Sequence, residues 1–545
     1  MSIILFHSLL FIFVIYLNGL YFSKKILFIK DYRNFYEISL IGLIVTIIFA
    51  QFLNFFITLN DYVIISNIIL LIIFLFFDHK IFKENFRVNL IILILSLLIM
   101  FMNIYGSGFS DDLDHYHYGF IANADNSNFI WGQSFLNPLY GTSPSWLIGH
   151  SFFNFDQYRL QDIHILNGIA LFLVIGLFLS ELNSNKNKRI FYSPILFSLL
   201  LFILLKYTRI KEFGIDRPSI LFFCFLIYYY LKYFIIPNNK DIVKNFILIS
   251  LISIFIFSIK IIYLPVLFFC LIIFIRKNLK LAKLDSMYLI LFVPILVFIF
   301  KNLLGTGCLI FPFEGSCIQY LPWSNFIYAK ELSISAEIFN KSWTSYSGDL
   351  SEKEYIKNFN WFKTWYERGS TEIFELFLTV LVIILISFFT FFSNLSEKKI
   401  INNNYKDFKL ILIFIILTSL SIYLVKNPVI RMNHHMIISL MILIITLVLN
   451  LDLKIFKKNL IYFFLIIGLL FNLYKNYDRI SENHFINNPK KLILHKITQP
   501  KKNIINDFVY YKGWFGKSPI GNQNLDDKNC LLYTSDAADD SLRVD

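Results

Sequence analysis

Charged residues are scarce in this sequence. Asp, Glu, Lys and Arg together make up 16% of its 545 residues, whereas 57% are hydrophobic. A soluble domain has about a quarter of charged residues, so the composition argues against a soluble globular protein. Apolar runs of roughly 18 or more residues recur along the chain, as is typical of transmembrane helices. The sequence therefore indicates a membrane protein with many spans.

Nucleotide-binding motifs are also lacking. The sequence has no Walker loop, no G-x-G-x-x-G after a strand and no C-x-x-C pair, so ATP-driven transport by this chain alone is not expected. The formal net charge of +13 could indicate a nucleic-acid-binding protein. Most Lys and Arg residues, however, lie in short loops between apolar runs, and that distribution sets membrane orientation. Nucleic acid is therefore not expected as a partner.

The apolar runs predict an all-α integral membrane protein of about fourteen transmembrane helices with two large extracytoplasmic loops. The expected spans are 3–22, 38–58, 62–77, 88–105, 163–182, 190–206, 218–236, 246–259, 261–275, 286–302, 373–393, 409–425, 436–450 and 459–474. Lys260 near the middle of the run 246–275, with Pro265 just after it, favours a hairpin of two helices over one long span.

Basic loops set the expected orientation. Loops rich in Lys and Arg fall on one side of the predicted helices, and the positive-inside rule makes that side cytoplasmic. We therefore expect a protein of the cytoplasmic membrane, in contact with membrane lipids, whose unusual polar residues face outward. Its oligomeric state is left open.

These spans divide the chain into consecutive segments. The segments are an N-terminal four-helix membrane segment (1–105), a first outer loop (106–162), a membrane core (163–302), a second outer loop (303–371), C-terminal membrane helices (373–474) and an outer segment (475–529). The remainder, 530–545, resembles the translation of a sequencing adapter. We expect it to be a scar, with the natural chain continuing beyond residue 529.

Cysteine is rare, with five residues in the chain. Cys224 and Cys270 fall inside expected spans, where they serve as small packing residues. Cys308 and Cys317 lie in the second outer loop with Gly and Pro between them. An oxidising compartment would allow a disulfide there, so we expect this pair to be bonded; the alternative is two free thiols in an apolar turn.

The strongest polar signal is the stretch 110–120, Ser-Asp-Asp-Leu-Asp-His-Tyr-His-Tyr-Gly-Phe, directly after an apolar run. Its acids are Asp111, Asp112 and Asp114, and its imidazoles are His115 and His117. Such a cluster at a membrane boundary indicates a functional site. A capped helix beginning at residue 110 would explain one or two of the acids, but not all three together with the histidines. A carboxylate here could act as a general base or hold a divalent cation. His-x-His is a weak zinc signal, so no cofactor is certain and a metal is left open.

This acidic cluster followed by Tyr-His resembles the GT-C superfamily of multispanning glycosyltransferases, particularly a poorly characterised bacterial branch related to mannosyl- and arabinosyltransferases. Three further stretches are similar to that superfamily: the outer turn 211–218 with Asp216 before a proline, Ser258-Ile-Lys260, and Lys301-Asn302 followed by Pro312-Phe313. The resemblance covers roughly residues 88–325.

The resemblance implies a GT-C-like fold and a sugar donor linked to polyprenyl phosphate or diphosphate, used from the outer face. It also implies inversion at the sugar carbon with an aspartate as base. That aspartate maps onto the cluster of Asp111, Asp112 and Asp114, and the resemblance does not choose among them.

The remaining polar groups near the outer ends of spans are suited to substrate binding. They comprise the cations Lys211, Arg217, Lys260, Lys301 and Arg431, together with Asp216, His115 and His117. Cations of this kind bind phosphate. The alternative for terminal Lys and Arg is that they reach to the membrane interface and bind nothing.

Two other functions remain open. One is an envelope polysaccharide polymerase or ligase, which also has many spans and large outer loops but relies on Arg-rich loops. The other is a transporter or lipid flippase, which predicts charges or helix breaks at mid-membrane depth and internal repeats. No clear repeat is present and the charges gather near helix ends, so the sequence favours the transferase.

Overall fold

The computed structural model describes residues 2–29, 33–85, 88–107, 112–155, 162–184, 192–210, 213–235, 242–276, 288–391, 403–448, 458–482, 502–505 and 508–511. Within these ranges the regular structure is helical except for one antiparallel hairpin of β1 (Lys502–Ile505) and β2 (Phe508–Tyr511) and a bridge between two cysteines. The α-helices are α1 (Ser2–Tyr21), α2 (Phe35–Asn54), α3 (Asp61–Asn85), α4 (Leu90–Tyr105), α5 (Tyr118–Asn126), α6 (Ser145–Phe152), α8 (Ile165–Ser184), α9 (Ser193–Lys206), α10 (Asp216–Tyr230), α11 (Ile242–Ile259), α12 (Phe268–Arg276), α13 (Leu289–Thr306), α14 (Phe326–Asn340), α15 (Glu352–Tyr355), α16 (Phe362–Phe391), α17 (Asn403–Val425), α18 (His434–Val448) and α19 (Lys458–Glu482).

Short π and 3-10 segments join or extend these helices. The π segments are η1 (Phe22–Ile26), η2 (Leu113–His117) and η7 (Leu231–Ile235). The 3-10 segments are η3 (Gln133–Phe135), η4 (Pro138–Thr142), η8 (Ile261–Leu267), η10 (Glu314–Ser316), η11 (Trp343–Ser345) and η12 (Ile430–Asn433).

The chain is a helical membrane protein. Among the described residues, 11 helices are long and apolar enough to cross a membrane, and three shorter apolar helices, Leu90–Tyr105, Ser193–Lys206 and Ile261–Arg276, coincide with further expected spans. The full number of about fourteen spans and a GT-C-like arrangement remain predictions. The expected break at Lys260 is confirmed, because α11 ends at Ile259 and η8 starts at Ile261.

The second outer loop is partly helical at its expected end. Apolarity predicted that the second outer loop extends to residue 371, yet α16 already begins at Phe362. Its first turns carry the sequence Lys-Thr-Trp-Tyr-Glu-Arg. Hydropathy excludes this sequence from a span, although its Lys, Glu and Arg residues form helix readily. The helix therefore extends beyond the apolar region into the stretch expected as the second outer loop.

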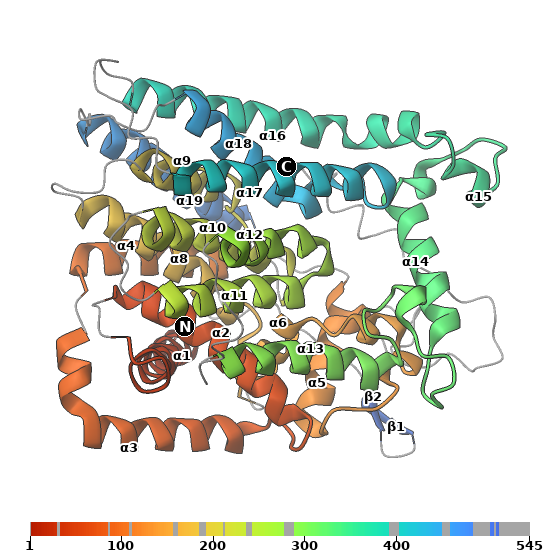
Figure 1. Cartoon of the computed structure of the whole chain (residues 1–545), viewed down its shortest axis with the longest axis horizontal. Helices are drawn as coiled ribbons and strands as arrows, with labels where there is room; N and C mark the ends of the chain where they lie inside the picture. The colour runs from red at the N-terminus through yellow and green to blue at the C-terminus, as the bar shows by residue number, and fades with distance from the viewer. Residues whose placement is uncertain are drawn as a thin grey trace.

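Long helices lie side by side, and several shorter elements gather at one end of them (Figure 1). At that end, on the right of the figure, lie α14, α15, α5 and the β1–β2 hairpin. The spans in α8 and α10 are 89% buried, whereas those in α16 and α19 are 28% buried. We therefore treat α8 and α10 as the centre of the bundle and α16 and α19 as peripheral helices that expose apolar side chains to lipid.

Close helix packing begins at the N-terminus, where α1 crosses α2 at Gly19 and Gly42. A Cβ atom on Gly42 would lie 1.9 Å from the carbonyl oxygen of Ile15, and one on Gly19 would lie 2.0 Å from that of Ile38. Neither position can accept a larger residue unless the helices separate. Asn34 starts α2 by accepting a hydrogen bond from the backbone N–H of Tyr36 at 3.0 Å.

A buried polar network ties together helix ends on the side away from Asp216. The Glu37 carboxylate accepts hydrogen bonds from Arg33 at 2.9 Å and from Lys232 at 2.8 Å, and Lys232 also pairs with Glu181 at 2.9 Å. Arg33 donates to Asn245 at 2.8 Å. Hydroxyl groups complete the network, those of Tyr228, Tyr229 and Tyr233. The two carboxylates of Glu37 and Glu181 balance the two cations of Arg33 and Lys232. The network therefore joins the ends of α2, α8, α10 and α11 without an excess of buried charge.

Candidate functional site

The candidate site is centred on the start of α10. Asp216 is the first residue of that helix, and its carboxylate forms an ion pair with Lys260. Lys260 has extended backbone angles (φ −151°, ψ 117°) between α11 and η8, so the chain breaks there and the side chain can reach α10. Two stretches that sequence resemblance singled out separately are thereby joined.

His117 brings the acidic loop to the same place. Its side chain is 2% exposed, and both ring nitrogens lack a hydrogen-bond partner among the described residues. Burial lowers the pKa of His117 to about 4, and the nearby carboxylates of Asp112 and Asp216 oppose this shift. The imidazole is therefore neutral at pH 7, with one nitrogen able to donate and the other able to accept a hydrogen bond.

A second buried histidine, His150 in α6, lies close to His117. Its ring packs edge-on against Phe213 at 4.7 Å and against Trp146 at 5.8 Å between centroids. Burial lowers the pKa of His150 well below its usual value, and His117 and His164 act in the same direction. His117 and His164 thus both lie within electrostatic range of His150, and burial keeps the imidazoles of His117 and His150 uncharged at neutral pH.

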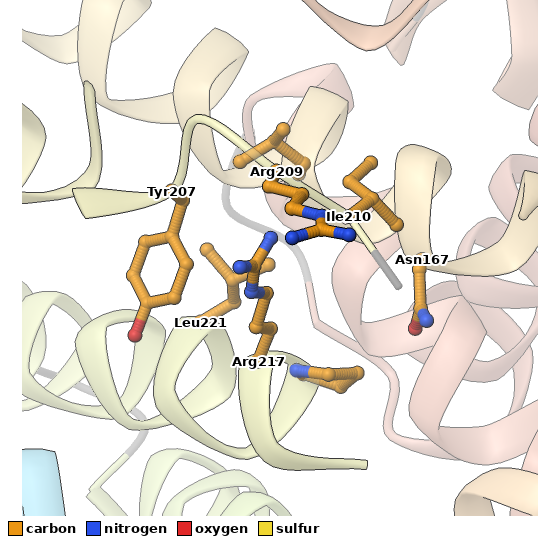
Figure 2. Close-up of a pocket in the computed structure, with 8 residues that line it drawn as sticks. Asn167, Tyr207, Arg209, Ile210, Arg217 and Leu221 are labelled. Carbon is orange, nitrogen blue, oxygen red and sulfur yellow. The ribbon is translucent and has the colours of Figure 1, made fainter. Parts of the chain in front are cut away.

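A pocket beside α10 is lined by arginines (Figure 2). It has about 250 Å³ of space between atoms, part of it open to solvent. Its lining comprises Asn167, Leu171, Tyr207, Arg209, Ile210, Arg217, Pro218 and Leu221. The Arg217 guanidinium lies 5.8 Å from the centre of the Tyr207 ring, and a third arginine, Arg479 from α19, donates hydrogen bonds to Thr208 beside the pocket. Guanidinium groups bind phosphate oxygens well, so the pocket is suited to an anion.

Tyr207 adds an uncharged donor to this wall. It is 4% exposed, and its hydroxyl has no hydrogen-bond partner among the described residues. Burial raises the pKa of Tyr207 well above its usual value. The hydroxyl therefore stays protonated at neutral pH and can donate to a ligand.

Two expected cations lie outside this pocket. Lys301 is buried and donates to the backbone carbonyl of Ser143 at 2.6 Å, with the carbonyl of Ser258 at 3.4 Å. It therefore links the end of η4 to the end of α11. Arg431 lies in η12, where its charge acts on Glu372 of α16. Neither residue lines the arginine pocket.

Several expected site residues cannot be placed. Asp111 and Lys211 lie outside the described residues, and so do the side chains of Asp114 and His115, whose backbone forms part of η2. A base among the three aspartates therefore remains a prediction. Among the described side chains, no group of three or more His, Cys, Asp and Glu residues is arranged to hold a metal ion, and a divalent cation at this loop remains a prediction.

The second outer loop begins with a covalent link. Cys308 and Cys317 form a disulfide that closes a loop over a sequence separation of 9 residues. Cys224 is a buried free thiol and Cys270 is a half-buried one. The bonded pair is the one that the Gly and Pro residues between the cysteines led us to expect.

Arg209, Arg479 and His150 were not anticipated from sequence. Arg209 and Arg479 are separated by 270 positions, and His150 is an isolated histidine in an aromatic stretch, so no local pattern marks them. Their role becomes visible only once α6, α10 and α19 are placed together.

Comparison with known proteins yields one match. No curated protein and no solved structure is detectably similar to this chain. A family model described as a domain of unknown function (DUF8201) matches residues 1–438. That range covers the helices from α1 to the start of α18 and with them every site residue discussed above except Arg479. The chain therefore belongs to the DUF8201 family.

Proposed function

We propose that this protein is a membrane glycosyltransferase that moves a sugar from a polyprenyl-linked phosphate donor to an acceptor on the extracytoplasmic face. The observation that carries the proposal is the meeting of two kinds of group around Asp216. Its charge acts on His117 of the acidic loop, and Asp216 directly precedes Arg217 of the anion pocket. The acidic loop thus lies near a pocket suited to an anion, and this supports a reaction in which a carboxylate accepts a proton while a phosphate leaves.

The proposed reaction uses these groups as follows. A carboxylate of the acidic loop, with Asp112 the member whose side chain is placed, takes the proton from the acceptor hydroxyl. The acceptor oxygen bonds to the sugar carbon as the bond from that carbon to the phosphate oxygen breaks. The phosphate leaves with the electron pair, and its negative charge is stabilised by Arg209 and Arg217.

Other residues position this machinery. The ion pair of Asp216 with Lys260 holds the start of α10 against the turn after α11, which sets the direction of Arg217. His117 is buried and neutral, so its imidazole can either donate a hydrogen bond to a sugar or acceptor hydroxyl or accept one from it. The apolar surroundings strengthen each of these polar contacts.

The test is turnover in proteoliposomes. The full chain would be given a panel of lipid-linked sugars, and release of the polyprenyl phosphate or diphosphate would be followed. Asp111→Asn, Asp112→Asn and Asp114→Asn would each be compared with wild type, and Asp349→Asn, an exposed acid in the second outer loop, is the matched control.

We expect release by wild type and by the control, and a loss of at least about a hundredfold in one of the three loop variants, as is typical when a general base is removed. Release that survives all three substitutions would place the base elsewhere. A folded wild-type protein that releases nothing from any donor would refute the transferase and favour a transporter.

A further inference from the structure

The described lining of the arginine pocket contains two guanidinium groups and no carboxylate. Figure 2 shows the guanidinium groups of Arg209 and Arg217 pointing toward one another across the pocket. The charges of Arg209 and Arg479 both act on Arg217, as does the carboxylate of Asp216. Asp216 is already ion-paired with Lys260. The guanidinium groups of Arg209 and Arg217 thus face one space, with Arg479 beside it, and two like charges around one space are unfavourable unless an anion joins them.

The pocket also offers hydrogen-bond donors rather than acceptors. Nη1 of Arg217, Nε of Arg209 and the hydroxyl of Tyr207 are buried and have no hydrogen-bond partner among the described residues. Buried donors without partners are costly, and a ligand rich in acceptor oxygens would satisfy them together. Phosphate groups have such oxygens in the geometry that guanidinium groups bind in pairs.

We propose that this pocket is a diphosphate site. A sugar joined to a lipid through one phosphate carries one negative charge there, whereas a sugar joined through a diphosphate carries two. The two guanidinium groups of Arg209 and Arg217 match the larger charge, and together with the hydroxyl of Tyr207 they match the larger number of oxygens. The inference rests on the proposed function only in assigning the diphosphate to a sugar donor. The shared chemistry is the diphosphate, whether it belongs to a lipid or is free in solution.

The three arginines in and beside the pocket come from three separate segments of the chain. Arg217 comes from the first turn of buried α10, Arg209 from the turn after α9, and Arg479 from the end of peripheral α19. Arg479 is held next to Arg209 by its hydrogen bonds to the carbonyl and hydroxyl of Thr208. Because the space of the pocket includes open solvent, a ligand with a lipid tail or an attached sugar need not be enclosed.

The test is direct binding to the purified full chain in lipid nanodiscs. The probes are inorganic phosphate, inorganic pyrophosphate, polyprenyl phosphate and polyprenyl diphosphate, titrated calorimetrically at fixed salt. The variants are Arg209→Gln and Arg217→Gln, and Arg209→Lys, which keeps the charge but loses the paired donors. Lys330→Gln is the matched control, because Lys330 is an exposed cation that pairs with Glu314 at 3.4 Å outside the pocket. Thermal unfolding of each variant shows whether it is folded.

We expect pyrophosphate to bind at least about tenfold more tightly than inorganic phosphate, and polyprenyl diphosphate at least about tenfold more tightly than polyprenyl phosphate. A tenfold difference in affinity corresponds to about 1.4 kcal/mol. The preference should be unchanged in Lys330→Gln, weaker in Arg209→Lys and absent in the two glutamine variants. A lipid ligand is indicated if polyprenyl diphosphate binds more tightly than pyrophosphate, and a soluble one if the two bind equally.

Two results would overturn the inference: equal affinity for the two forms in wild type, or a preference that persists in folded glutamine variants. Neither result depends on turnover. Diphosphate binding without any sugar transfer would refute the proposed function alone, whereas transfer from monophosphate donors without a diphosphate preference would refute this inference alone.

Discussion

Acidification should destabilise the protein through His117. Burial lowers the pKa of this residue to about 4 in the folded chain, whereas an unfolded chain has a histidine pKa of about 6.5. Between these two values the unfolded chain binds a proton that the folded chain does not. Stability is therefore greatest above pH about 6.5, falls as the pH drops through this window, and stops changing on this account below about 4.

The size of the effect follows from the two pKa values. Going from pH 7.5 to pH 5 should lower the free energy of unfolding by about 2 kcal/mol, and the full difference of about 2.5 pKa units corresponds to about 3 kcal/mol. His150 adds to the loss, because burial also lowers its pKa. The carboxylates of Asp112 and Asp216 oppose the shift of His117, so neutralising either of them should steepen the dependence.

The informative variant is His117→Phe. Both ring nitrogens of His117 lack partners among the described residues, so phenylalanine removes the titrating group without leaving a new unsatisfied one. Thermal unfolding in detergent, measured from pH 7.5 to pH 4.5, should show a smaller decrease for this variant than for wild type. His79→Phe, at an exposed position of α3, serves as the control and should follow wild type. Parallel pH profiles for His117→Phe and wild type would refute the reasoning.

Three further predictions concern the scaffold. Gly42→Ala places a Cβ atom 1.9 Å from the Ile15 carbonyl oxygen, so α1 and α2 must separate, and we expect a clear decrease in unfolding temperature by calorimetry; an unchanged temperature would contradict the packing. Glu37→Gln leaves two buried cations with too little negative charge and should cost about 3–5 kcal/mol, whereas Glu314→Gln, in an exposed pair, should cost about 1 kcal/mol or less by the same unfolding assay. Cys308→Ser opens the loop to Cys317 and should cost about 2–3 kcal/mol; alkylation of the wild type that gives the same mass with and without reductant would disprove the bond.

Most of the helical framework could be predicted from the sequence. Long apolar runs leave few alternatives to membrane helices, and Lys260 with Pro265 marked the break between α11 and η8 correctly. The disulfide between Cys308 and Cys317 was also expected correctly. These successes depend on local signals, either the length of a run or a cluster of rare residues.

The arginine pocket and the buried network could not be predicted in this way. Arg209 and Arg479 approach each other only because α19 packs beside α9, and no periodicity in either segment specifies that pairing. Glu37, Glu181 and Lys232 are single charges near the ends of different helices. From sequence each resembles an ordinary interfacial residue, and their mutual neutralisation depends on which helices are neighbours.

The helix that carries Arg217, α10, is held more firmly than the helix that carries Arg479, α19. Lys232, just beyond α10, is held by Glu37 and Glu181, so sliding this helix by one turn would leave charges buried without partners. The wall that carries Arg217 is therefore fixed to the opposite side of the membrane domain. Arg479, beside the pocket, belongs to α19, whose span is only 28% buried. We expect a ligand with a lipid tail to enter the pocket laterally from the bilayer by displacing α19. The fixed helix α10 then holds Arg217 in place to bind the phosphates of that ligand.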